Sequence, residues 1–202
     1  MEKNRFFCLL LFFFFVHSTN AQVPGFGRCP HVNVMQNFDA KRYLGLWYEI
    51  QKYPFIFSIG GRCITATYDW NSDRTISVFN KQIRGNGEEN SITGTARLVH
   101  PGIASLKVSF NQSPFSHEAD YNVLYTDYND FAVVYSCTSF LGLINAKSVW
   151  ILSRSRFPSQ YIIDKAYEVL RDNDISTLFL SQTDQKDCPE EIHYNVIENF
   201  RH

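Results

Sequence analysis

The stretch YLGLWYEI, residues 43–50, decides the fold of this chain. Aromatic and aliphatic residues are interleaved there with small or polar ones, which is typical of a β-strand with a buried face. Gly45 lets another element approach the backbone closely, and Trp47 carries the largest apolar surface that one residue can bring. Burying the indole ring would contribute at most about 4–6 kcal/mol. The rest of the fold must therefore supply a cover for Trp47.

The composition of the whole chain is typical of one compact domain. Of its 202 residues, 16% are aromatic and 19% are charged, and the formal net charge is −1. These values exclude disordered and collagen-like classes. The chain has no basic block of the kind that binds nucleic acid or an anionic membrane, so neither partner is expected.

The N-terminal residues have the pattern of a secretory signal peptide. Lys3 and Arg5 precede an unbroken apolar run over residues 6–16, and polar residues follow up to Ala21. Eleven apolar residues are too few to span a bilayer, so this run is no transmembrane segment. We therefore predict that residues 1–21 are a signal peptide, that residues 22–202 form a single domain, and that the protein is secreted and extracellular.

Four cysteines remain in the predicted mature chain: Cys29, Cys63, Cys137 and Cys188. An even number in an oxidising compartment predicts two disulfides, and the sequence alone leaves three possible pairings. A zinc site is the alternative, but no two of these cysteines have the C-x-x-C spacing that zinc sites use. No metal is therefore predicted.

Turn residues divide the chain into eight predicted strands. The expected ranges are 43–50, 63–70, 75–84, 91–99, 104–110, 119–126, 131–137 and 148–154. A helix follows, because apolar residues recur at three- and four-residue spacing between Pro158 and Asn173. A short ninth strand is expected over residues 176–183. This is an all-β pattern that favours an eight-stranded antiparallel up-and-down barrel with one C-terminal α-helix packed outside it; two packed sheets are the alternative.

The barrel interpretation places three separated features at one end. If the first strand rises from a closed end, the eighth strand descends and brings Arg154 to Trp47. A guanidinium over an indole face adds about 0.5–2 kcal/mol. The 126–128 connection, Thr126-Asp127-Tyr128, lies at the same end, and Asp127 can bond backbone N–H groups there. We predict structural roles for these residues and for Gly45.

With these features the sequence resembles the lipocalins. Residues 45–49 (GLWYE) resemble the first signature of that family, residues 126–128 (TDY) the second, and Arg154 in VWILSR the third. Within the family the resemblance is closest to the branch of apolipoprotein D and the insect bilin-binding proteins. The resemblance covers about residues 25–189. It selects one cysteine pairing, Cys29 with Cys137 and Cys63 with Cys188.

The resemblance implies a secreted, non-enzymatic carrier of a small hydrophobic ligand. The candidate ligands are a bilin, a retinoid, a fatty acid or related lipid, and a steroid. No cofactor is required, although a bilin chromophore could be the bound ligand. The family pattern implies six cavity residues, and the parity shared with Arg154 adds two more. The expected ligand-binding set is Tyr68, Asn80, Gln82, Arg84, Phe110, Tyr121, Trp150 and Leu152.

Asn80, Gln82 and Arg84 would form a polar row on one wall, which suits an amphipathic ligand with a carboxylate or carbonyl and Arg84 as its anion partner. In the alternative, this strand turns its polar side to solvent, and Phe79 and Ile83 point inward.

Apolar residues on three connections form a predicted rim at the open end. They are Phe55, Ile56, Phe57, Phe115, Phe140, Leu141, Leu143 and Ile144. Such a rim would cover the cavity or contact a lipid surface or a receptor, which gives an alternative role in protective lipid scavenging. The opposing interpretation folds these residues inward as upper core.

An enzyme is disfavoured, because the chain lacks a G-x-S-x-G, phosphate-loop or H-E-x-x-H motif. A lipocalin-type enzyme would also need a free pocket thiol, and full pairing of the cysteines leaves none. Asn111-Gln112-Ser113 is the one acceptor sequon, so Asn111 is a candidate glycosylation site.

Overall fold

The structure, a computed structural model, describes residues 23–54, 60–110 and 118–190. Several expected features lie outside these ranges. They are the signal peptide, the sequon at Asn111, the rim residues 55–57 and 115, and the tail after residue 190. These features remain predictions.

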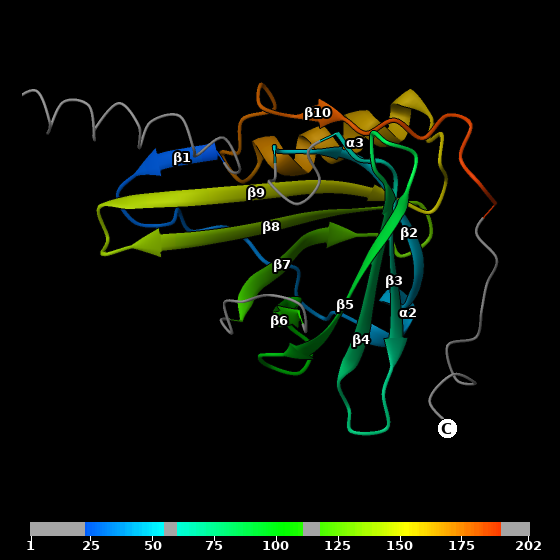
Figure 1. The fold of residues 1–202 in the computed structure, drawn as a ribbon. Helices are drawn as coiled ribbons and strands as arrows, with labels where there is room; N and C mark the ends of the chain where they lie inside the picture. Colours follow the sequence, from blue (N-terminus) through cyan, green and yellow to red (C-terminus); the bar gives the residue numbers. More distant parts are fainter. Residues whose placement is uncertain (1–22, 55–59, 111–117, 191–202) are drawn as a thin grey trace, which may run out of the picture.

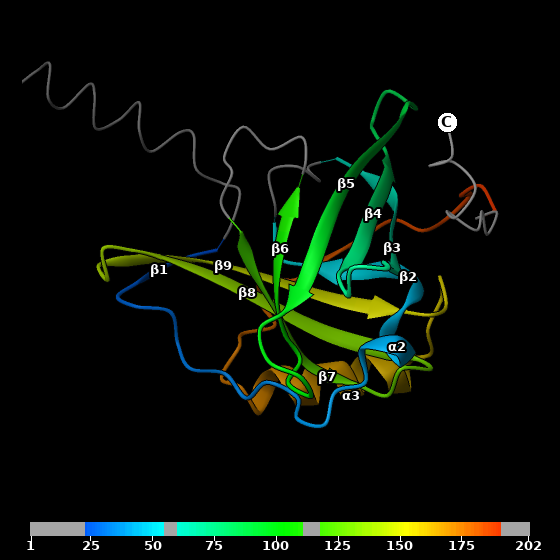
Figure 2. The ribbon, with the colours of Figure 1, turned by 90° about the horizontal axis from the view of Figure 1, so that it is seen from below.

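Eight consecutive antiparallel strands close into a barrel, which confirms the fold expected from the sequence. Each strand pairs with the next one along the chain, and β9 also pairs with β2 (Figures 1 and 2). The strands are β2 (Gly45–Lys52), β3 (Arg62–Trp70), β4 (Ile76–Ile83), β5 (Glu89–Leu98), β6 (Ser105–Phe110), β7 (Ala119–Thr126), β8 (Phe131–Phe140) and β9 (Ile144–Ser153).

Four further elements are added to the barrel. They are β1 (Val23–Phe26), α2 (Ala40–Tyr43), α3 (Gln160–Arg171) and β10 (Ser181–Gln182). The strand β1 pairs with β9, and β10 pairs with β2. The helix α3 lies against the outside of the barrel wall formed by β8 and β9 (Figure 1).

Two of these elements were not expected, and a third is shorter than predicted. The sequence before residue 43 shows no helical period, but the Asp39 carboxylate caps α2 by accepting the N–H groups of Lys41 and Arg42 at 3.0 and 3.3 Å. The short strand expected within 176–183 is present, but it is limited to Ser181–Gln182, the two residues that pair with β2. The Ser176 hydroxyl accepts the Leu178 N–H at 3.3 Å and turns the chain before it reaches β2.

The β8–β9 hairpin is longer than predicted. Phe140 and Ile144 pair with each other inside the strands and do not belong to the loop. Three residues, Leu141 to Leu143, make the turn, with φ of 52° at Leu141 and 69° at Gly142. A left-handed conformation is accessible to glycine without strain, so Gly142 permits this tight connection.

Arg154 covers Trp47 at the closed end of the barrel. Its guanidinium carbon lies 3.6 Å from the centroid of the indole ring. The same group donates to the carbonyls of Leu46 at 2.6 Å, Leu44 at 2.8 Å and Tyr128 at 3.1 Å. Burial lowers the pKa of Arg154, but a guanidinium remains charged in proteins. One side chain therefore ties α2, β2 and the β7–β8 turn together.

Gly45 is required beside this contact. Its φ is +88°, a left-handed conformation that glycine adopts without the strain that a Cβ would cause. In the facing turn, Asp127 Oδ1 accepts the backbone N–H groups of Asn129, Asp130 and Phe131 at 2.8–3.1 Å. Gly45 thus allows the backbone conformation at the start of β2, and Asp127 stabilises the β7–β8 turn, in line with the structural roles predicted for them.

The apolar residues form two separate clusters. One fills the barrel around Trp47 and includes Val78, Val123 and Leu152. The other lies between the outer wall and α3, where Val149 and Ile151 of β9 meet Ala166 and Leu170. Alternation along β9 sends odd-numbered residues to α3 and even-numbered residues into the barrel.

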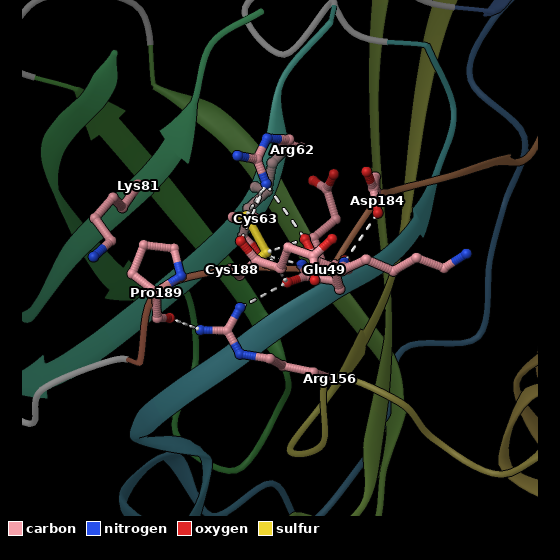
Figure 3. Close-up of a disulfide and its surroundings, with 12 residues drawn as sticks. Glu49, Arg62, Cys63, Lys81, Arg156, Asp184, Cys188 and Pro189 are labelled. Carbon is pink, nitrogen blue, oxygen red and sulfur yellow. Dashed lines mark hydrogen bonds between the residues drawn. A yellow bond between two sulfur atoms is a disulfide. The ribbon is translucent and has the colours of Figure 1, made fainter. Parts of the chain in front are cut away.

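The two disulfides are those that the resemblance implied, Cys29–Cys137 and Cys63–Cys188. The second one fastens the C-terminal segment to β3 (Figure 3), where the Cys63 N–H donates to the Asp184 carbonyl at 2.8 Å. Nearby, Arg156 donates to the Pro189 carbonyl at 2.5 Å. The chain after α3 is therefore held against the barrel by covalent and polar contacts.

We predict that Arg154→Met lowers the free energy of unfolding by about 3 kcal/mol or more. The variant loses the cation–π contact and leaves three carbonyls without their donor. Denaturant unfolding at equilibrium would measure the change. Arg171→Met, at an exposed position on α3, is the matched control; a loss below about 1 kcal/mol in the Arg154 variant would contradict the prediction.

Candidate functional site

The register of β4 shows which of its residues line the inner wall of the barrel. Ile76 and Val78 belong to the cluster inside the barrel, so Asn80 and Gln82, which share their parity, face inward as well. Phe79 faces outward and is 36% exposed. The alternative in which this strand turns its polar side to solvent is therefore wrong for Asn80 and Gln82.

Asn80 carries an unpaired polar atom inside the barrel. Its side-chain oxygen Oδ1 is buried, and it has no hydrogen-bond partner among the described residues. A buried amide without a partner costs about 1–3 kcal/mol. Buried polar groups in proteins nearly always have a hydrogen-bond partner. A bound ligand would supply that partner and would explain why the Asn80 side chain lies on the inner wall.

Three tyrosine hydroxyls meet at the lower end of the same space. Tyr121 Oη lies 2.8 Å from Tyr43 Oη and 2.8 Å from Tyr68 Oη. Three hydroxyls carry three protons, but the two hydrogen bonds use only two of them. No other hydrogen bond of these hydroxyls is found among the described residues, so one O–H group is available to donate to another molecule. We refer to Tyr43, Tyr68 and Tyr121 as the tyrosine triad.

Burial keeps the tyrosine triad protonated. It raises the pKa of Tyr68 to about 12 and raises the pKa values of Tyr43 and Tyr121 well above the ordinary value. The cause is desolvation, which disfavours the phenolate form. At neutral pH the triad is therefore an uncharged group of hydroxyls.

The remaining predicted ligand residues surround this space, with one exception. Leu152 is buried in the barrel cluster, and Trp150, Tyr121 and Phe110 pack against that cluster while half-buried. Arg84 follows the last residue of β4; it is exposed and donates to Asn90 Oδ1 at 3.0 Å. The structure thus brings seven of the eight residues to the inner wall and leaves Arg84 at the open end.

Gly94 explains how Phe110 fits into the wall. The two residues are paired between β5 and β6, and Gly94 faces inward opposite Val78. A Cβ at Gly94 would overlap the Ser109 carbonyl oxygen and would come within 2.8 Å of the Phe110 ring. The missing side chain therefore makes room for the ring.

Sequence reasoning missed one residue of the site. Tyr43 was expected to begin the first strand, but it lies on α2, and its ring packs 5.1 Å from the ring of Trp47 and 5.5 Å from that of Tyr68. No local signal reveals this contact, because the three rings come together only when α2 closes the barrel floor.

Comparisons with known proteins agree with this geometry. A family model described as a lipocalin-like domain matches residues 38–185. Apolipoprotein D of rabbit (Oryctolagus cuniculus) is 41% identical over 167 residues, covering 81% of this chain and 86% of the relative. Apolipoprotein D of guinea pig (Cavia porcellus) is 38% identical over 178 residues, covering 87% and 92%.

Solved structures show the same fold. Insecticyanin from the tobacco hornworm Manduca sexta superposes with a TM-score of 0.72 at 24% identity, covering 81% of this chain and 89% of that structure. A closed eight-stranded barrel with an external helix and an inward-facing wall of aromatic and polar residues defines the class of ligand-binding barrels. The chain belongs to the lipocalin family, and the recognition made from its sequence signatures is confirmed.

Two further properties concern residues 23–54, 60–110 and 118–190. None of the helices in these ranges is both long and apolar enough to cross a membrane. Over the same residues, the histidine, cysteine and acidic side chains form no group of three or more that could hold a metal ion.

We predict that the tyrosine triad makes the protein lose stability at alkaline pH. A tyrosine has a pKa near 10 in the unfolded chain and a higher one in the fold, about 12 for Tyr68. The stabilising contribution is therefore complete below about pH 10 and is lost as the pH rises towards about 12. Denaturant unfolding at several pH values, together with tyrosinate absorbance, would measure it.

Tyr121→Phe should reduce this alkaline loss, whereas Tyr161→Phe, at an exposed position on α3, is the matched control. Ionisation of all tyrosines of the native protein in one step near pH 10 would contradict the prediction.

Proposed function

We propose that this protein is a secreted carrier that binds and transports a small hydrophobic ligand inside the barrel. Membership of the lipocalin family supports the proposal. The single observation that carries it is the buried, unpaired Oδ1 of Asn80, which faces an interior lined mainly by aromatic and aliphatic side chains. A protein core gains nothing from such a group, whereas a binding site uses it to orient a ligand.

The polar groups of the interior define the ligand further. Asn80 Oδ1 can accept one hydrogen bond, and the tyrosine triad can donate one. A hydroxyl group can satisfy either of them, and a carbonyl can accept from the triad. Because the triad is uncharged and Arg84 lies at the open end, a neutral head group fits the deep part of the barrel and a carboxylate fits the mouth.

The candidate ligands are those named from the family resemblance: a retinoid, a steroid, a fatty acid or related lipid, or a bilin bound as a chromophore. We propose that binding involves Tyr68, Asn80, Gln82, Phe110, Tyr121, Trp150 and Leu152, with Arg84 at the mouth. Catalysis is not part of the proposal, because the two disulfides use all four cysteines of the described chain.

We predict that Asn80→Leu makes the protein more stable but a poorer binder. Replacing an unpaired buried amide by an apolar side chain should raise the free energy of unfolding by about 1–2 kcal/mol. Retinol, titrated by quenching of tryptophan fluorescence, should bind about tenfold more weakly because its hydroxyl loses an acceptor. Thr93→Leu on the outer face of β5 is the matched control. A variant that is less stable and binds retinol as the wild type does would contradict the assignment.

We predict that Arg84→Gln lowers the affinity for retinoic acid about fivefold to tenfold and leaves the affinity for retinol unchanged. Retinoic acid and retinol share their hydrocarbon part, so the difference isolates the carboxylate. The same fluorescence titration measures both. Equal effects on the two probes would remove Arg84 from the site.

The natural ligand can be identified from protein purified under native conditions. One retained compound, or visible absorption from a bilin, supports the carrier. A heterogeneous mixture of lipids supports the second candidate, a protective scavenger that contacts a lipid surface or receptor. The exposed apolar residues Phe140, Leu141, Leu143 and Ile144 at the open end favour this candidate. Absence of any extracted compound, together with no binding of the retinoids, would overturn the proposal.

A further inference from the structure

The β8–β9 hairpin projects beyond the other strands, and β1 lies along its β9 arm (Figures 1 and 2). Phe26, the last residue of β1, is directly opposite Ile144, and Ile144 is directly opposite Phe140. Opposite residues of paired strands point to the same face, so the three side chains stand in a row. Leu141 and Leu143 complete the group in the turn. We call these five residues the apolar tip.

The apolar tip is exposed to an extent that is uncommon for large side chains. Phe26 is 97% exposed, Leu141 95% and Leu143 70%, and Phe140 and Ile144 are each more than half exposed. Single exposed hydrophobic residues are ordinary, but five adjacent ones mark an interaction surface.

The tip is held in place by the structure behind it. Asn145 donates from Nδ2 to the carbonyls of Phe26, Gly27 and Arg28 at 3.1–3.2 Å, and the Gly27 N–H donates to the Leu143 carbonyl at 2.7 Å. The disulfide Cys29–Cys137 fixes the chain that follows. The tip is therefore preorganised, which lowers the entropic cost of docking.

The charges around the tip indicate the partner. Residues 23–34 and 135–150 contain no aspartate or glutamate, but they contain Arg28, which is exposed, and Lys147, which is partly exposed. The sequence has no basic block, but the fold places Arg28 against the turn at Gly142, beside the apolar tip, and Lys147 three residues behind Ile144 on β9. Exposed apolar side chains with cations beside and behind them match the acyl and phosphate layers of a phospholipid surface.

The orientation of the tip connects it with the barrel. Register along β8 and β9 is unbroken, so Ile144 lies on the same face of β9 as Trp150 and Leu152 on the inner wall. Across the open end, the β4–β5 turn is polar and contains Arg84 and Glu88. Contact of the tip with lipid would therefore bring the mouth to the surface while the polar turn stays in water.

We propose that the apolar tip docks this protein on a phospholipid surface, with its apolar side chains among the acyl chains and Arg28 and Lys147 at the phosphates. The proposal deepens the second part of the proposed function by naming the partner. It does not depend on which ligand the barrel holds.

Co-sedimentation with vesicles tests the docking. We expect the wild type to bind vesicles of phosphatidylcholine, and to bind more tightly when phosphatidylserine is included, by up to about fivefold for each cation. The double variant Phe26→Ser/Leu141→Ser should lower the partition coefficient at least about tenfold. Leu178→Ser, which removes an 89% exposed leucine on the chain after α3, is the matched control and should bind as the wild type does.

Retinol titration without vesicles separates this proposal from the carrier function. We expect all three proteins to bind retinol equally. Loss of retinol binding with retained vesicle binding would contradict the carrier and leave the docking intact. The docking proposal is wrong if the wild type binds neither kind of vesicle, or if the double variant co-sediments with vesicles as the wild type does. It is also wrong if the tip instead mediates a concentration-dependent dimer that the double variant abolishes.

Discussion

The contact between Arg154 and Trp47 is the constraint on which the rest of the structure depends. An open barrel end would expose the indole ring and leave the carbonyls at the start of β2 to water. The guanidinium 3.6 Å from the ring closes that end, and it is held there because it also donates to three carbonyls from two segments. Since one end is sealed in this way, ligand access is restricted to the other.

The interior above this floor balances stability against recognition. The lower part is filled by apolar side chains and the three hydroxyls of the tyrosine triad, which satisfy one another except for one proton. Higher up, Asn80 has a buried acceptor with no partner in the described chain. Groups of this kind cost free energy in the empty protein and regain it when a complementary ligand binds.

The open end is asymmetric, because the hairpins on its two sides end in turns of different chemistry. The β8–β9 hairpin continues past the barrel and gains β1 as a third strand, which gives it a stable apolar end. The β4–β5 connection is a short polar turn in which Asn86 and Glu88 bond to each other at 2.8 Å. A barrel mouth with one apolar side and one polar side has a preferred orientation at any interface between water and lipid.

The sequence by itself determined the barrel, the family, the sealed floor and most of the inner wall. Period-two alternation and turn residues specify strands locally, and the parity of Arg154 also fixes that of Trp150 and Leu152. Only the tertiary structure decided the rest. Tyr43 joins Tyr68 and Tyr121 through α2, and Phe26 joins Ile144 through β1, because these contacts link segments whose local sequence carries no periodic signal. The alternation in the sequence predicts which strand residues face inward, but the pairing of distant segments decides which side chains contact one another.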